Sequence, residues 1–112
     1  MTTITHAPIC TVIVTVDTES NVMPELEDHA RAGLAAFAEL DGFVSGALHR
    51  STDGSRLVQY LQWRDEAAHL ACMNDPRWED LPSTNRFMEI VNSGQAVMNV
   101  RVFDVVAMSG QL

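Results

Sequence analysis

The sequence predicts an α+β domain of the ferredoxin-like type, in which one antiparallel sheet carries its helices on a single face. The first observation is the order of segments, which reads strand, helix, strand, strand, helix, strand. The second is the tight turn at Asp53-Gly54, which joins the two middle strands into a hairpin. The third is length, because 112 residues correspond to a single domain, 1–112.

Strands are expected where β-branched and aromatic side chains cluster, as in Ile9–Asp17, because these side chains suit a pleated surface. The first helix is expected over Asn21–Leu40, with Pro24 in its first turn and Gly42 after its end. The other predicted elements are the strands Phe43–Ser51 and Arg56–Trp63, the helical segments Asp65–Met73 and Trp78–Asn92, and the final strand Ala96–Met108.

Particular residues support the helices. Asp65 is expected to cap the second helical region, since its carboxylate can accept from amides of the first turn. Pro82 is expected to bend or stop Trp78–Asn92, because proline removes a helical hydrogen bond. One apolar stripe of the first helix consists of Leu26, Ala30, Leu34 and Phe37.

The sheet is predicted to be apolar on both faces. Because the helices cover only one face, the second apolar face predicts a homodimer that stacks two sheets. Side chains alternate between the two faces of a strand. In the second strand of the hairpin, one face carries Leu57, Gln59, Leu61 and Trp63, and the other carries Val58, Tyr60 and Gln62. In the last strand, one face carries Met98, Val100 and Val102, and the other carries Val97, Phe103 and Val105.

Charge and cysteine content exclude several classes of protein. Lys and Arg number 7 against 15 Asp and Glu, a net charge of −8, so the basic surface that nucleic acids and anionic membranes require is lacking. Cys10 and Cys72 do not form a disulfide framework, and neither a signal peptide nor a membrane span is recognised. These features are typical of a cytoplasmic protein.

No metal or cofactor motif is recognised. The histidines lie about twenty residues apart, without the short spacing typical of metal ligands. No P-loop, GxGxxG or nucleophile elbow occurs, so no bound metal or cofactor is expected. The four histidines are His6, His29, His49 and His69.

Polar groups among apolar ones are the candidate site residues. Gln59 and Trp63 share one strand face, so an amide and an indole N–H point together into the core if helices cover that face. The alternative is that Gln59 bonds to neighbouring backbone and Trp63 only packs. His49, roughly opposite Arg56–Gln59, is a candidate proton acceptor, or a structural histidine at the sheet rim.

On the second helical region, His69 follows Asp65 by four residues and is either a surface histidine in an ion pair or a substrate contact. Arg86 could offset an anionic substrate, although a surface arginine is the alternative, and Cys72 is interpreted as a packing residue. Trp78 is interpreted as core or pocket wall. The substrate contacts that we expect are Phe37, Leu61, His69, Met73, Arg86 and Phe87.

The run DGFVSGALHRSTDG at 41–54, followed by VQYLQW at 58–63, resembles the antibiotic biosynthesis monooxygenase family. The strong similarity covers about positions 41–70, and Asp75-Pro76-Arg77 also fits the family. The resemblance implies a dimeric α+β barrel. In the polyketide branch it implies oxidation of a phenolic or anthrone-type aromatic by O2, without flavin, haem or metal.

The same resemblance implies roles for particular residues. Trp63 matches a family tryptophan whose N–H could donate to a substrate oxygen, and His49 matches a family histidine that accepts a proton or lies at the rim. Gln59 occupies the position of a catalytic asparagine, so its amide reaches one methylene farther. His69 falls near a family tyrosine position.

The sequence therefore predicts a cofactor-free monooxygenase acting on an aromatic small molecule, with O2 as co-substrate. The alternative is a non-catalytic ligand-binding member of the same fold family, which the changes at Gln59 and His69 favour. Haem degradation, a third branch, would need a histidine placed for iron, and none of the four is clearly so placed.

Overall fold

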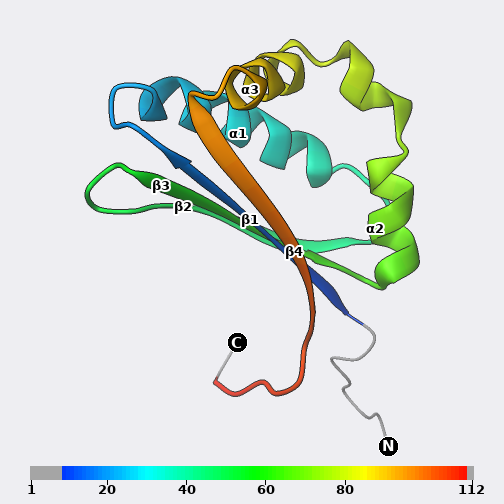
Figure 1. Ribbon diagram of the computed structural model, residues 1–112. Helices are drawn as coiled ribbons and strands as arrows, with labels where there is room; N and C mark the ends of the chain where they lie inside the picture. The colour runs from blue at the N-terminus through cyan, green and yellow to red at the C-terminus, as the bar shows by residue number, and fades with distance from the viewer. Residues whose placement is uncertain (1–8, 111–112) are drawn as a thin grey trace, which may run out of the picture.

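In the computed structural model, which describes residues 9–110, four antiparallel strands form one sheet in the order β2-β3-β1-β4. Figure 1 shows α1 and α3 over one face of the sheet and α2 at the end of that same layer. This arrangement confirms the predicted ferredoxin-like α+β fold. The elements are β1 Cys10–Thr18, α1 Met23–Phe37, β2 Phe43–Arg50, β3 Arg56–Trp63, α2 Glu66–Met73, the 3₁₀ helix η1 Pro76–Asp80, α3 Pro82–Asn92 and β4 Ala96–Asp104.

Three predicted elements have wrong boundaries, and the first of them is α1, which was expected over Asn21–Leu40 but spans Met23–Phe37. Trp78 lies in η1 and not in α3, because Pro76 and Pro82 each begin a separate helix. Proline suits a first helical turn, where its missing N–H costs nothing. The last strand ends at Asp104 and not at Met108, because Asp104 pairs with Cys10, the first residue of β1.

The predicted hairpin is confirmed and holds β2 and β3 in register. At its turn the Asp53 carboxylate accepts hydrogen bonds from the hydroxyls of Ser51 and Ser55, at 2.7 Å each, and from the Ser55 N–H at 3.0 Å. These donors lower the pKa of Asp53 to about 2. Gly54 has a φ of 74°, which explains why glycine follows the aspartate.

A β-bulge in β2 decides which side chains face the helices. Phe43 opposes Trp63 and Ser45 opposes Gln62, so one extra residue lies between the two pairs. Phe43 therefore packs against Trp63 under the helices, whereas His49 opposes Val58 on the open face. Simple alternation along β2 would put His49 and Phe43 on the same face, and the bulge places them on opposite faces.

The core lies between the sheet and the helices and has two parts. One surrounds Leu26, Leu57 and Ile90, beneath α1 and α3. The other surrounds Leu61 and Trp63, near α2. Within residues 9–110, no helix combines the length and the apolar character needed to cross a membrane.

Candidate active site

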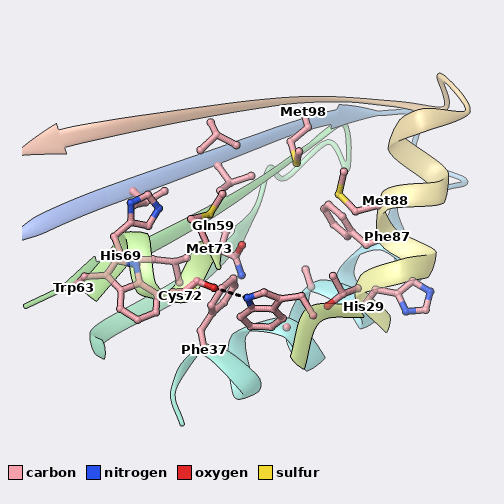
Figure 2. A pocket seen from close by; sticks show the side chains of 18 residues that line it. His29, Phe37, Gln59, Trp63, His69, Cys72, Met73, Phe87, Met88 and Met98 are labelled. Carbon is pink, nitrogen blue, oxygen red and sulfur yellow. Dashed lines mark hydrogen bonds between the residues drawn. The ribbon is translucent and has the colours of Figure 1, made fainter. Parts of the chain in front are cut away.

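A pocket of about 290 Å³ lies between the sheet and the helices, where the two parts of the core meet. The sheet, α1, α2, η1 and α3 all contribute side chains to it (Figure 2). Apolar and aromatic side chains dominate the lining, as is usual for small-molecule sites. The lining residues are Val12, Val14, His29, Ala30, Gly33, Phe37, Gln59, Leu61, Trp63, His69, Cys72, Met73, Trp78, Thr84, Phe87, Met88, Met98 and Val100.

Trp63, at the end of β3, carries an unpaired donor in this pocket. The residue is 0% exposed, and its Nε1 is buried without a hydrogen-bond partner among the described residues. The edge-on rings of Phe37 and Phe43, with centroids at 6.0 and 5.5 Å, hold the indole in place. Because an unpaired buried donor costs free energy, an acceptor oxygen that reached this N–H would relieve that cost.

Gln59 lies on the same face of β3 as Trp63, with both side chains lining the pocket. This confirms that the helices cover the face that both residues share. Among the described residues, hydrogen bonds engage the side-chain amide of Gln62, on the other face of β3, and not that of Gln59, which contradicts the alternative interpretation. The amide is therefore available to a ligand in the pocket that Trp63 also lines.

His69 is buried in the pocket wall and is not a surface residue. It is 9% exposed, and its ring centroid lies 6.4 Å from that of Trp63. The predicted ion pair with Asp65 is absent from the described residues because the Asp65 carboxylate caps α2, accepting from the Ala68 N–H at 2.8 Å. Burial lowers the pKa of His69, partly opposed by Glu66, so a neutral imidazole faces the pocket.

The structure brings together most of the predicted site residues. Besides Trp63, Gln59 and His69, four residues predicted as substrate contacts line the pocket, namely Leu61, Phe37, Met73 and Phe87.

Two predicted site residues lie elsewhere. His49 is exposed on the open face of the sheet, away from the pocket. Arg86 points to Glu25, with its Nε 2.6 Å from Oε2, and its Nη1 is 3.3 Å from Glu89. The guanidinium is thus occupied by carboxylates, and it lowers the pKa of Glu25 to about 2.

Several lining residues are not among those predicted from the sequence. His29 lies on α1 with Gly33 and Phe37, at the four-residue spacing that places side chains on one helix face, so this stripe was a usable signal. Met88 and Met98 face the pocket from α3 and β4. Alternation along β4 could have indicated Met98, but nothing in the sequence indicated that α3 turns Met88 inward.

Trp78 and Cys72 also bring polar groups to the pocket. The Trp78 indole N–H donates to the Cys72 carbonyl at 2.7 Å, and burial raises the pKa of the Cys72 thiol to about 11. Cys10 and Cys72 are free and buried. Residues 9–110, a range that does not include His6, contain no group of three or more His, Cys, Asp or Glu side chains that could hold a metal ion.

The sequence profile described as "Antibiotic biosynthesis monooxygenase" matches residues 9–88. Tetracenomycin-F1 monooxygenase from Streptomyces glaucescens is 38% identical over 82 residues, which is 69% of this chain and 70% of that protein.

Solved structures agree with the fold. SnoaB, a cofactor-independent oxygenase from Streptomyces nogalater, superposes with a TM-score of 0.76 at 20% identity, covering 94% of this chain and 100% of that one. The monooxygenase ActVA-Orf6 of Streptomyces coelicolor, in complex with nanaomycin D, gives 0.64 at 21% identity, covering 92% of each chain. From the profile match and the 38% identity, this chain belongs to the antibiotic biosynthesis monooxygenase family and is a monooxygenase of that family.

Proposed function

We propose that this protein oxidises an aromatic polyketide-type substrate, an anthrone or an electron-rich phenol, to a quinone with O2 and without a cofactor. The observation that carries the proposal is the buried Trp63 N–H, which lacks a partner within the described residues and borders an apolar pocket. The description of SnoaB as cofactor-independent and the name of the tetracenomycin relative support it.

In this reaction the substrate supplies the electrons. Loss of one proton from the reacting carbon of an anthrone gives an anion, which passes one electron to O2. The two radicals combine to form a carbon-bound peroxide anion, which takes back the proton lost in the first step and becomes a hydroperoxide. Loss of water from the hydroperoxide leaves a carbonyl, so the substrate and one O2 give one quinone and one H2O. The protein has to bind a flat ring, stabilise its anion and exclude water.

Each of these tasks is assigned to particular residues of the pocket. The Trp63 N–H donates to the oxygen on which negative charge develops, and the Gln59 amide, four residues earlier on the same strand face, is a second donor to the ligand. His69 takes the proton, because its neutral, desolvated imidazole lies next to Trp63. His49, which lies on the other face of the sheet, has no part in the pocket of one chain.

The role of His69 predicts a particular pH dependence. Because burial lowers the pKa of His69 below its ordinary value of 6.5, the base form persists below that pH. We expect kcat/KM to stay high down to pH 6.5 and then to fall as His69 becomes protonated. A His69→Gln variant should be slow and should lack this acidic limb. A limb centred above pH 6.5, or one retained in the variant, would contradict the assignment.

The proposal includes a homodimer formed through the open face of the sheet. Val97 is 67% exposed and Phe103 is 44% exposed, and both lie on this face of β4. Ile13 and Tyr60 oppose each other at its centre, on β1 and β3. Stacking two such faces would bury these side chains and would form the walls of a barrel between two chains.

Light scattering after size exclusion tests the dimer. At micromolar concentration we expect a mass about twice the 12.3 kDa of one chain. Phe103→Asp should shift the protein toward the monomer, because it places a charge in the apolar interface. Leu70→Asp is the matched control, since Leu70 is 51% exposed but lies on α2 in the helix layer. A monomeric native protein would rule out this assembly.

Oxygen uptake tests the reaction itself. Protein treated with a chelator is mixed with anthrone, and both O2 consumption and quinone absorbance are followed. We expect uptake above the spontaneous rate, with one quinone formed per O2. Tight anthrone binding without uptake would instead favour a ligand-binding protein.

We expect the reaction to take place in the cytoplasm, in keeping with the free Cys10 and Cys72 thiols.

A further inference from the structure

The pocket has a second polar end, formed by His29 of α1. Trp63 and His69 lie at one end of the pocket, and His29 lies at the other, beyond Phe87 and Met88 (Figure 2). The walls between these ends are largely apolar and aromatic. A ligand that spans the pocket therefore meets hydrogen-bonding groups at both of its ends.

A chain of charged contacts fixes the orientation of the His29 ring. His29 Nε2 is 3.0 Å from Glu25 Oε2, four residues earlier on the same helix. Glu25 is in turn held by Arg86 of α3, through Nε at 2.6 Å and Nη2 at 3.3 Å. These contacts keep the Glu25 carboxylate ionised, with its pKa lowered to about 2. An oriented imidazole is the result, as where a carboxylate fixes a histidine in other sites.

The carboxylate also decides which nitrogen a ligand can use. An ionised carboxylate only accepts hydrogen bonds, so Nε2 must carry the proton that it shares with Glu25. Among the described residues, Nε2 is the ring nitrogen of His29 that is hydrogen-bonded, which leaves Nδ1 for a ligand. With the proton on Nε2, Nδ1 carries a lone pair that accepts a hydrogen bond, and it suits a hydroxyl group.

We infer that His29, oriented by Glu25, is a binding residue for a hydroxyl group at the end of the substrate far from the carbon that is oxidised. The favoured ligand is thus a flat, elongated aromatic molecule with an oxygen function at the Trp63 end and a hydroxyl at the His29 end. This inference rests on the proposed substrate class, but it concerns binding and not the oxygen chemistry.

Two quinones that do not consume O2 test the inference. In 2-(hydroxymethyl)anthraquinone and 2-ethylanthraquinone, a hydroxyl replaces a methyl group of nearly the same size. Both tryptophans of the chain line the pocket, so quenching of their fluorescence reports binding directly. We expect the native protein to bind the hydroxymethyl compound about fivefold more tightly than the ethyl compound, the effect of one net hydrogen bond.

Variants separate the role of His29 from general effects on the pocket. His29→Leu should bind both quinones equally, and His29→Gln, which keeps a hydrogen-bonding group, should retain part of the preference. Glu25→Ala should lose part of it by releasing the ring, whereas Glu89→Ala should not. Glu89 is the matched control because it also pairs with Arg86 but is not a partner of His29.

The possible results are distinct. The inference would be overturned if His29→Leu preferred the hydroxymethyl compound as strongly as the native protein does. It would also be overturned if neither quinone bound. Melting curves of the variants establish that they are folded before binding is compared. A protein that discriminates between the quinones as expected but takes up no O2 with anthrone would refute the proposed reaction and leave the His29 site in place.

Discussion

Trp63→Phe is expected to lower kcat of the O2-dependent oxidation by about a hundredfold or more, the loss typical of a removed oxyanion donor. The indole N–H is buried and lacks a partner within the described residues, so its removal breaks no hydrogen bond there. Phenylalanine keeps an aromatic ring against Phe37 and Phe43. The fold should therefore survive while stabilisation of the substrate anion is lost.

The measurement is quinone formation under saturating anthrone, compared with binding of the same quinones by the variant. Phe43→Leu serves as the matched control, because it loosens the packing around Trp63 but leaves the N–H in place. We expect the control to lose far less activity than Trp63→Phe. Unchanged turnover in Trp63→Phe combined with Gln59→Leu would refute the roles of both residues.

Gly42→Ala is expected to destabilise the protein by about 3 kcal/mol or more, through two separate effects. Gly42 has a φ of 86°, which is unfavourable for any residue with a Cβ. An added Cβ would also clash with the Cβ of Ala68, which precedes His69 on α2. The helix would have to move, and we expect turnover to fall as well.

Gly94→Ala isolates the first of these effects. Gly94 has nearly the same φ, 87°, but an added Cβ would have no neighbour within 4 Å. Its cost should be about 1–2 kcal/mol, from backbone strain alone. Urea unfolding gives the loss of unfolding free energy in each variant. The difference between the two losses measures how closely the turn at Gly42 packs against α2. Equal losses would mean that the contact with Ala68 relaxes without cost.

Local features of the sequence determined most of the fold. The Asp53-Gly54 turn gave the hairpin correctly, because side-chain and backbone preferences act within a few residues. The cap at Asp65 was predicted for the same reason. Alternation along β3 placed Gln59 and Trp63 on one face, and the structure confirms that this face is covered by helices.

Contacts between distant segments determined what the sequence did not. The bulge in β2 depends on pairing with β3, and it separates His49 from the pocket. The burial of His69 depends on how α2 packs against β3, and Arg86 is held by a carboxylate on another helix. The unpaired state of the Trp63 N–H is likewise a property of the whole core. Sequence spacing fixes which side chains share a face, but only packing between elements decides which of them meet, because those contacts join residues far apart in the chain.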